Sequence, residues 1–402
     1  DSVKFIFLLS VKNILFIIPT PMFPLGTSNF NSFRRIKGLM KYDYKIIIVC
    51  PKIKYSQLNN VVNLKNNYNI EVLDVLFLNA NTGAKKHLTS IFFNCKQLKN
   101  IIENNKLDLI HIVNPPDIVP FIVSALAIKN KIPFIFHIAD PGPESMATIF
   151  SGVKKHILVL ISSIIEKIII NRSNGLITVN NVLREQIVKT RNVSGHDFKV
   201  VYNVPERINI QNSNKGRKIK SIVYIGTLSS EMIGIKDFLY NYKKIHNWQE
   251  TIFNIIGSGP HKNELERICV ENNLINQIVF KGHLDYNQAM QIVADSSLAL
   301  LPYRDTPLTR ISLPTKLFEY MNASKVIVCP NLPGIIEILG IQNQGIYDVR
   351  INDAIYDKIN KLFNSKYLIL ETEQINYNIS KKYNINNEVQ KIHELYNTVF
   401  NT

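Results

Sequence analysis

Short, almost continuously apolar runs alternate with longer helical patterns along most of this 402-residue chain. Runs of this kind, such as "YKIIIVCP" at residues 44–51, are typical of parallel strands that helices cover on both faces. The segments between them, such as residues 28–42 and 117–131, have helical patterns. The alternation therefore predicts repeated βαβ units and an α/β fold with a doubly wound parallel sheet.

The alternating series occurs twice. The expected strands are residues 13–19, 44–51, 70–77, 107–116, 133–140 and 175–180 in the first series, and residues 221–228, 251–259, 277–284, 297–303 and 325–331 in the second. A polar stretch at residues 205–221 lies between the series and is expected to be a linker. We therefore expect two tandem Rossmann-like domains whose parallel sheets face a central cleft. Their expected limits are 1–203 and 204–380, with a C-terminal helix at 381–402 packing back toward the N-terminal domain.

Composition narrows the functional classes. A net charge of +16 suggests an anionic partner, namely a phosphorylated substrate, a membrane surface or a nucleic acid. No dense run of basic and aromatic residues and no zinc-finger pattern is present, so no nucleic-acid partner is expected. A diffusely basic, solvated surface is the simpler alternative. The four cysteines have no metal-binding spacing, and no apolar run reaches the ~18 residues that cross a bilayer. We expect a cytoplasmic protein without a bound metal.

Glycine and proline follow the strands of the second series. The strand ends carry "GTLSS", "GSGP", "KGH" and "PYRD". Glycines at such ends allow a ligand to approach the backbone, and the carboxyl ends of parallel strands are where ligands bind. Glycine also ends strands that bind nothing, so ordinary turns remain an alternative. The candidate ligand-binding residues here are Gly226, Thr227, Gly257, Gly259 and Arg304.

The segment at residues 312–339 gives the strongest local signal. Ser312 is expected to cap a helix whose N-terminal region holds Leu313, Thr315 and Lys316. Such an N-terminus offers free N–H groups, a hydroxyl and an ammonium group to a phosphate. Glu319, one turn later, is placed to accept hydrogen bonds from both hydroxyls of a ribose. Alternatively, Glu319 caps the helix or pairs with Lys316 on a solvated face.

Five segments together carry a resemblance to a known family. They are "PTKLFEYMNASKVIVCPN", "IIGSGPHKNELE", "GLITVNNVLREQI", "VVYNVPE" and "PFIFHIADPGPES". From about Asn13 to Tyr396 the chain resembles the retaining, nucleotide-sugar-dependent glycosyltransferases of GT-B fold in family 4, the large group that builds surface polysaccharides. The resemblance implies transfer of a hexosyl residue from a nucleoside-diphosphate sugar to a glycan or a lipid-linked acceptor, such as a polyprenyl-linked one. It implies no cofactor or metal, an acceptor-side N-terminal domain and a donor-binding C-terminal domain.

The resemblance also implies roles for residues of the N-terminal domain. The family places a histidine at the end of the strand at 133–140, where this chain has Ala139, and His137 lies two residues earlier on the same strand face. His137 and Asp140 are thus expected to be catalytic and to position sugar and acceptor, and Glu144 to lie on the acceptor side. A buried, hydrogen-bonded core histidine is the alternative for His137. Gly26 and Thr27 correspond to the loop near the sugar phosphate.

Further departures from the family pattern affect charged positions. The first glutamate of the family's two-glutamate motif falls on Ile311, and its diphosphate-binding Arg and Lys fall on Thr227 and Ile233. Lys316, Arg304, Arg310 or Lys236 is expected to supply the missing cation. Because Ile311 and Ala139 occupy two functional positions of the family, the alternative is a catalytically degenerate subunit that binds a nucleotide sugar or a partner transferase without turnover.

Residues 151–172, which are apolar with basic flanks, suit an anionic membrane surface. An ordinary helix of the first domain is the alternative. A peripheral position on the inner face of the plasma membrane is therefore a second expectation for the location. Residues 1–10 precede the resemblance and are either an upstream extension or a short hydrophobic anchor.

Overall fold

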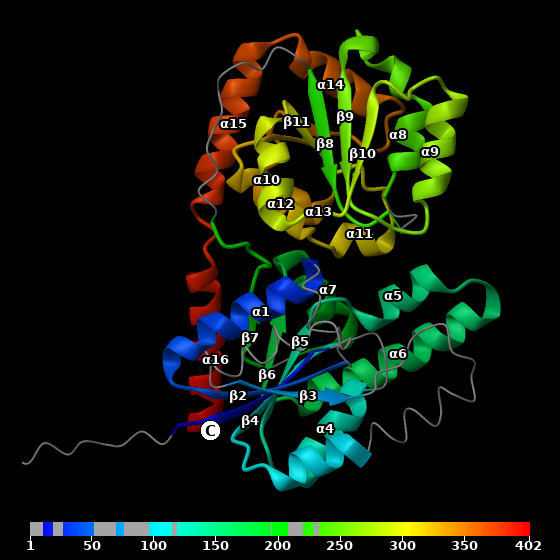
Figure 1. Cartoon of the computed structure of the whole chain (residues 1–402). Helices are drawn as coiled ribbons and strands as arrows, with labels where there is room; N and C mark the ends of the chain where they lie inside the picture. The colour runs from blue at the N-terminus through cyan, green and yellow to red at the C-terminus, as the bar shows by residue number, and fades with distance from the viewer. Residues whose placement is uncertain are drawn as a thin grey trace, which may run out of the picture. The chain divides into compact units, whose positions relative to one another are not determined.

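The structure is a computed structural model that describes residues 11–18, 27–51, 70–75, 96–114, 119–193, 195–207, 220–228 and 233–402. Residues 1–10, Gly26 and most of the expected linker lie outside these ranges. The chain divides into two compact units (Figure 1). The first comprises Asp1–Val179, Arg184–Tyr202 and Ile385–Thr402, and the second comprises Asn180–Leu183 and Asn203–Asn384.

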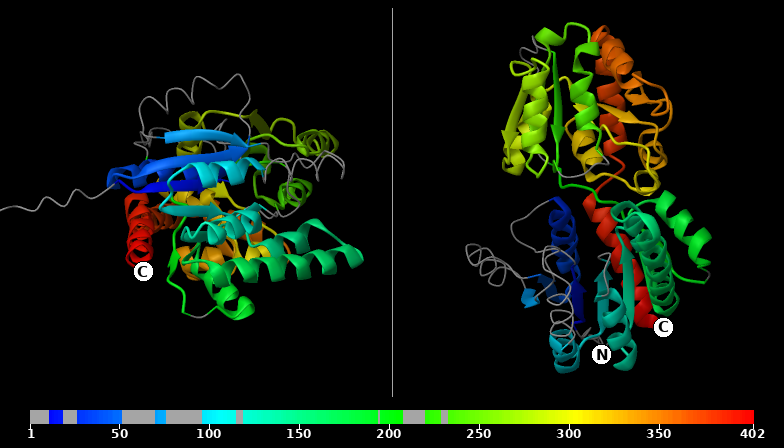
Figure 2. Two further views of the ribbon diagram at one scale, coloured as in Figure 1. Left: turned by 90° about the horizontal axis from the view of Figure 1, so that it is seen from below. Right: turned by 90° about the vertical axis from the view of Figure 1, so that its right-hand side faces the viewer.

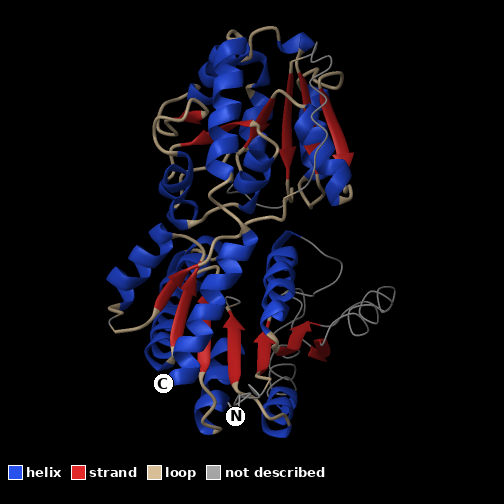
Figure 3. Cartoon of the chain, turned by 90° about the vertical axis from the view of Figure 1, so that its left-hand side faces the viewer, coloured by secondary structure: helices blue, strands red, loops and turns tan. Residues whose placement is uncertain are grey.

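The first unit contains a parallel sheet of seven strands in the order β3-β2-β1-β4-β5-β6-β7 (Figure 3). The strands are β1 (Asn13–Ile17), β2 (Lys45–Pro51), β3 (Ile70–Val75), β4 (Leu109–Val113), β5 (Phe134–Ile138), β6 (Gly175–Thr178) and β7 (Phe198–Val200). All six expected strands of this half are confirmed. The three-residue strand β7 was not expected, because it is too short to show a periodic pattern.

Helices cover both faces of the first sheet. They are α1 (Thr27–Leu39), the 3-10 turn η1 (Met40–Tyr42), a helical segment at 96–104, α4 (Val119–Lys129), α5 (Gly142–Ile149), α6 (Gly152–Arg172), α7 (Asn181–Arg191) and α16 (Ile385–Asn401). The strand order turns at β1, so right-handed crossovers place α1 and α4 on opposite faces. Helix α16 packs beside α1, and Leu395 and Tyr396 join Ile14 and Phe16 in one core.

The second unit contains a parallel sheet of six strands in the order β10-β9-β8-β11-β12-β13. The strands are β8 (Ser221–Ile225), β9 (Ile252–Ile256), β10 (Ile278–Gly282), β11 (Leu298–Leu300), β12 (Val326–Pro330) and β13 (Ile346–Tyr347). The five expected strands are confirmed. The sixth, β13, has only two residues and gives no sequence signal.

The helices of the second unit also lie on both faces of its sheet (Figure 2). They are α8 (Ile235–Tyr240), η3 (Tyr242–Lys244), η4 (Trp248–Glu250), α9 (Lys262–Glu271), α10 (Tyr286–Asp295), α11 (Pro307–Ile311), α12 (Thr315–Asn322), α13 (Pro333–Leu339), α14 (Ala354–Phe363) and α15 (Lys366–Ser380). On one face, Phe238, Ile268 and Ile359 pack on Tyr224 and Phe253 of the sheet. The expected pair of Rossmann-like domains is thus confirmed. In the part of the chain that the structure describes, no helix is long and apolar enough to cross a bilayer.

Candidate functional site

The ends of β8, β9 and β10 are joined through two glycines. The N–H of Gly226 donates to the Ile256 carbonyl at 2.9 Å, and the N–H of Gly257 donates to the Gly282 carbonyl at 2.7 Å. Gly257 has φ +138°, and a Cβ there would overlap the carbonyl oxygen of Gly226. The close approach of these two loops therefore requires glycine at position 257.

A second set of backbone bonds continues this edge. The N–H of Leu228 donates to Ser258, and the N–H of His261 donates back to the Leu228 carbonyl, both at 2.9 Å. Gly259 lies against the Leu228 backbone, where a side chain would not fit. Thr227 is exposed at the turn between the two loops. Gly226, Thr227, Gly257 and Gly259, all predicted as ligand-binding residues, thus lie in one interlocked loop pair.

Helix α12 begins later than expected. Its first residue is Thr315 and Pro314 occupies the N-cap position without a side-chain capping bond. Proline disfavours helical backbone in the preceding residue, so the helix does not extend back through Leu313. Ser312 instead ends α11, where its hydroxyl donates to the Leu308 carbonyl at 2.7 Å. The expected capping role of Ser312 is therefore wrong, and Leu313 is a buried connector.

Helix α12 is fixed against the end of β8. The N–H of Ile225 donates to the Tyr320 hydroxyl at 2.9 Å. Near the start of the helix, the Lys316 side chain lies along Gly226, since a Cβ on that glycine would be 2.6 Å from Lys316 Cε. The predicted residues Gly226, Lys316 and Thr315 are thereby brought to one corner of the second unit. Tyr320 was not predicted, because an aromatic residue in an amphipathic helix looks like an ordinary core residue.

Glu319 lies one turn after Thr315 and is buried, with 3% of its surface exposed. Positions four apart share one face of a helix, so Glu319 follows Thr315 along α12. This burial contradicts the alternative of a solvated face.

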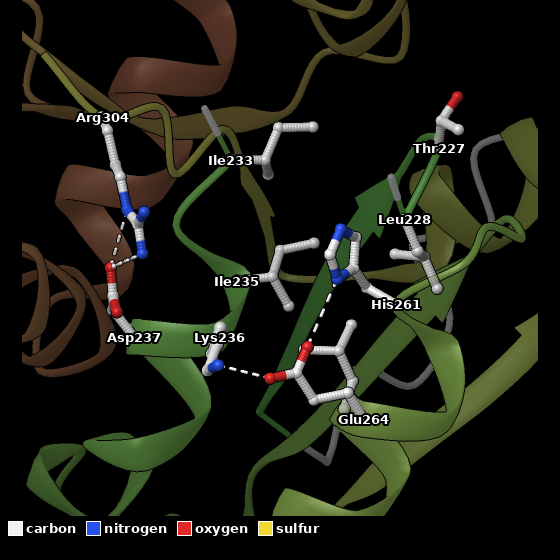
Figure 4. Close-up of a pocket in the computed structure, with 10 residues that line it drawn as sticks. Thr227, Leu228, Ile233, Ile235, Lys236, Asp237, His261, Glu264 and Arg304 are labelled. Atoms are coloured by element: carbon white, nitrogen blue, oxygen red, sulfur yellow. Dashed lines mark hydrogen bonds and ion pairs between the residues drawn. The ribbon is translucent and has the colours of Figure 1, made fainter. Parts of the chain in front are cut away.

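A cavity of about 310 Å³ opens beside Thr227 (Figure 4). Lys236 forms an ion pair with Glu264, and His261 Nδ1 lies 3.3 Å from the same carboxylate. Arg304 donates from Nε and Nη2 to one Asp237 oxygen at 2.9 and 2.7 Å. Both cations of the cavity therefore already have a carboxylate partner.

The four cations that are candidates for binding a diphosphate differ in whether they already have a carboxylate partner. Lys236 and Arg304 are paired within the cavity, and Arg310 is paired with Asp305 on the exposed side of α11. Lys316 forms no ion pair with the residues that the structure describes. At the family's cation positions, Thr227 is exposed, and Ile233 forms an isolated antiparallel bridge with Tyr303.

In the first unit, Asn114 fixes the end of β5. Its side-chain amide donates to the Asp140 carbonyl at 2.6 Å, and its side-chain oxygen accepts from the N–H groups of Ala139 and Asp140 at 2.9 and 3.3 Å. Asp140 itself is exposed. Asn114 was not predicted, although a polar residue directly after β4, beside the point where the strand order turns, is a usable signal.

His137 lies on β5 and is fully buried. Its Nε2 lies 3.3 Å from Arg35 Nη1, and its Nδ1 lies 3.1 Å from His111 Nε2. His111 Nδ1 in turn lies 2.7 Å from the Tyr396 hydroxyl on α16. This environment matches the interpretation of His137 as a buried, hydrogen-bonded core histidine.

The direction of these hydrogen bonds follows from Arg35. A guanidinium only donates, so His137 Nε2 accepts, His137 Nδ1–H donates to His111, and His111 Nδ1–H donates to Tyr396. Burial, and then the positive charge of Arg35, hold the pKa of both histidines well below the usual 6.5. Burial also lowers the pKa of Arg35, to about 10. The chain therefore holds two neutral imidazoles in fixed tautomers.

Glu144 belongs to a buried charge cluster. Arg191 donates to both Glu144 oxygens at 3.0 and 2.8 Å and to Glu166 at 2.9 Å. Glu166 also accepts from the Gly142 N–H at 2.9 Å. Burial would lower the pKa of Arg191, but the two carboxylates raise it overall, while burial raises the pKa of Glu166. The cluster anchors the start of α5, and both oxygens of Glu144 are occupied by Arg191.

Three further positions from the sequence analysis are Gly26, Thr27 and Ile311. Gly26 lies outside the described residues, and Thr27 is the first residue of α1. Ile311, at the position of the family's first glutamate, is buried, and its carbonyl accepts from the Asn180 side chain at 2.9 Å. The second unit thus gathers most predicted donor-side residues, whereas the first unit separates exposed Asp140 from buried His137.

Comparisons with known proteins agree with this architecture. The family model described as Glycosyltransferase Family 4 matches residues 33–204, and the one described as Glycosyl transferases group 1 matches residues 219–365. An uncharacterized glycosyltransferase of Methanocaldococcus jannaschii, MJ1607, is 24% identical over 185 residues. That match covers 43% of this chain and 46% of the relative, which is less than half of either protein.

Two solved structures show the same fold at low sequence identity. The pneumococcal O-GlcNAc transferase GtfA, in complex with UDP and GlcNAc, has a TM-score of 0.72 at 11% identity, covering 98% of this chain and 100% of that chain. WaaG, a glycosyltransferase involved in lipopolysaccharide biosynthesis, has a TM-score of 0.67 at 11% identity, covering 95% and 98%. The two family matches together span most of the chain, and with this architecture they place it among proteins of the GT-B glycosyltransferase fold.

Proposed function

We propose that the chain transfers a hexosyl residue from a nucleoside-diphosphate sugar to a glycan or polyprenyl-linked acceptor, with retention of anomeric configuration, in cell-surface polysaccharide biosynthesis. The proposal includes a cytoplasmic location, peripheral on the inner face of the plasma membrane. The corner formed by α12 and the end of β8 carries the proposal, because it joins a helix N-terminus, the buried carboxylate of Glu319 and Lys316, which forms no ion pair with a described residue.

In this proposal the donor lies along the interlocked loops after β8 and β9. Gly226, Gly257 and Gly259 allow the close packing that shapes this edge of the sheet, and the N–H groups at the start of α12 receive the phosphates together with Lys316. Glu319 accepts hydrogen bonds from the ribose hydroxyls. Negative charge that develops on the departing nucleoside diphosphate is stabilised by the same N-terminus and ammonium group.

On the acceptor side, Asp140 is the exposed group at the end of β5 and is proposed to contact the reacting sugars. His137 acts through the strand: its bonds to Arg35 and His111 hold β5, and Asn114 then holds Asp140. His137 is therefore proposed as a positioning residue. Glu144 contributes by anchoring α5 through Arg191.

The relatives give the proposed substrates their support. GtfA was solved with UDP and GlcNAc, and WaaG is described as acting in lipopolysaccharide biosynthesis. One observation favours the second candidate, a subunit that binds nucleotide sugar or a partner transferase without turnover. The side chain at 311 is apolar and buried, so the carboxylate that the family places against the sugar is missing.

One experiment separates the two candidates. Release of nucleoside diphosphate is measured from UDP-, GDP-, ADP- and TDP-sugars, with and without a membrane lipid extract, and donor binding is measured in parallel. Glu319→Ala is compared with Glu371→Ala, which removes an exposed glutamate of α15 in the same unit. Release with one donor that only Glu319→Ala abolishes supports the transferase, and NMR of the product's anomeric proton then tests retention.

Two results would each count against a part of the proposal. Donor binding without release under every condition favours the non-catalytic subunit. Equal donor binding and release by Glu319→Ala and the wild type removes the proposed ribose contact.

A further inference from the structure

Helix α6 exposes an apolar stripe. Val153 and Leu160 expose 77% and 62% of their surface, and Ile157, Ile161 and Ile164 are also exposed. At about 100° per residue, these five positions fall within an arc of about 100°, so they form one continuous face. Over the distance from Val153 to Ile164 the stripe is about 17 Å long. In a globular protein such a stripe normally faces the core, whereas here it faces outward.

The opposite side of α6 makes the packing contacts. Ser162 lies against Gly142 at the start of α5, and Glu166 accepts the Gly142 N–H. Helices α5 and α6 form a hairpin whose far end projects away from the sheet (Figures 1 and 2). Phe150, at the turn between the two helices, is also exposed. The apolar stripe is thus the face that this hairpin does not use for its own folding.

Basic residues border the stripe, and neither helix of the hairpin carries an exposed acid. Lys154 and Arg172 lie along one border, Lys167 lies along the other, and all three are exposed. The acidic residues of α5 and α6 are Glu144 and Glu166, and both are paired with Arg191. The hairpin therefore presents apolar and positive groups together.

Two of the lysines occupy positions that do not stabilise the helix. Lys154 and Lys155 lie in the first turn of α6, where the helix dipole is positive and acidic residues are favoured. Neither lysine forms an ion pair with a residue that the structure describes. Exposed aliphatic side chains and lysines at a helix N-terminus are both unfavourable in water, and both become favourable on an anionic bilayer.

We propose that the outward stripe of α6 is a docking surface for an anionic phospholipid bilayer. The helix lies in the plane of the membrane, with Val153, Ile157, Leu160, Ile161 and Ile164 among the acyl chains and the bordering lysines on phospholipid headgroups. A second copy of the chain would fit this face less well than a bilayer. Pairing two such faces brings basic borders together without an acid to oppose them.

The test uses the full chain and sedimentation with vesicles, either of phosphatidylcholine alone or of equal parts phosphatidylcholine and phosphatidylglycerol. Ile157→Ser/Leu160→Ser removes part of the stripe, and Lys154→Gln/Lys167→Gln removes charge from both borders. Val270→Ser/Ile275→Ser is the matched control, because both residues are exposed aliphatics of the second unit. Thermal unfolding of each variant verifies folding, and exposed substitutions are expected to change stability little.

The wild type is expected to bind the vesicles that contain phosphatidylglycerol. The stripe variant should partition at least about tenfold more weakly, because burying one Leu or Ile side chain is worth about that factor. The charge variant should lose about tenfold or more on phosphatidylglycerol vesicles alone, and the control should match the wild type.

Three results would overturn the proposal. The first is no binding of the wild type to phosphatidylglycerol vesicles, and the second is undiminished binding of the stripe variant. The third is a wild-type dimer in sedimentation equilibrium that is absent in the stripe variant. The last assigns the face to a second copy. Vesicle binding and nucleoside-diphosphate release are separate measurements, so failure of the docking surface and failure of the proposed transfer are distinguishable.

Discussion

Arg35 Nη1 on α1 lies 3.3 Å from His137 Nε2 on β5, and both side chains are buried. The contact joins α1, the helix that follows β1, to β5, the strand that precedes Asp140. It also requires a neutral His137, because a protonated imidazole has no acceptor for the guanidinium. His111, on β4, extends the same requirement to a second imidazole.

We predict that the chain becomes less stable as the pH falls below about 6.5, the pKa of a histidine in the unfolded chain. Folding holds the pKa of His111 and His137 well below that value. Below 6.5 the unfolded chain therefore binds protons that the folded chain excludes, and the free energy of unfolding falls. Each histidine contributes a slope of up to about 1.4 kcal/mol per pH unit.

Urea unfolding between about pH 7 and pH 5 measures this slope. The double variant His111→Gln/His137→Gln should have a smaller slope, because the contribution of up to two protons is lost. The variant is also less stable overall. His156→Gln, which removes an exposed histidine of α6, is the control for the loss of a surface histidine. A double variant with the same slope as the wild type would show that these histidines are protonated in the folded chain.

The strands were predictable because parallel strands buried on both faces leave a continuous apolar run in the sequence. The helix boundaries were less predictable. Because of Pro314, α12 begins only at Thr315, and the Ser312 hydroxyl donates to a carbonyl of α11 instead of capping α12. The polar contacts were not predictable. Arg35 and His137 are 102 residues apart, and nothing local distinguishes a buried arginine of α1 from a solvated one.

In the candidate site, too, some features were predictable from the sequence and others were not. Glycines at strand ends were predictable, because the backbone conformation itself requires them. The state of the cations was not, since it depends on which carboxylate each one meets. Lys236 and Arg304 are paired with Glu264 and Asp237, acids that no local pattern links to them.

Arg191→Leu is predicted to destabilise the chain by about 3–5 kcal/mol, because the Glu166 carboxylate would stay buried without a cation. Arg267→Leu is the matched control. It removes an exposed arginine whose pair with Glu271 on α9 is solvated, and it should change the free energy of unfolding by about 0.5 kcal/mol or less. Urea unfolding of both variants provides the measurement. Equal losses in the two variants would mean that the Glu144–Arg191–Glu166 cluster contributes no more than a surface pair.

Gly257→Ala is predicted to cost about 2–5 kcal/mol, the sum of strain at positive φ and overlap with the Gly226 carbonyl. Gly282→Ala isolates the strain at positive φ, because the φ of Gly282 is +67° and nothing lies near the added methyl group. We expect this variant to lower the free energy of unfolding by about 1 kcal/mol. Thermal unfolding compares the two variants. Similar losses would show that the loops after β8 and β9 separate easily, contrary to their interlocked backbone bonds.

The last prediction concerns the cation that receives the diphosphate. Lys316→Gln should weaken binding of the cognate nucleoside diphosphate by about tenfold or more, since hydrogen bonds to charged groups are worth about 1.5–3 kcal/mol. The paired variants Lys236→Gln/Glu264→Gln and Arg304→Gln/Asp237→Asn should change the affinity by less than about threefold, because each removes a cation together with the carboxylate that neutralises it and so leaves the local net charge unchanged. Isothermal titration at two salt concentrations measures both the affinity and its salt dependence. A larger loss in either paired variant than in Lys316→Gln would mean that the donor opens one of the cavity's ion pairs, and the diphosphate would then be assigned to the cavity beside Thr227.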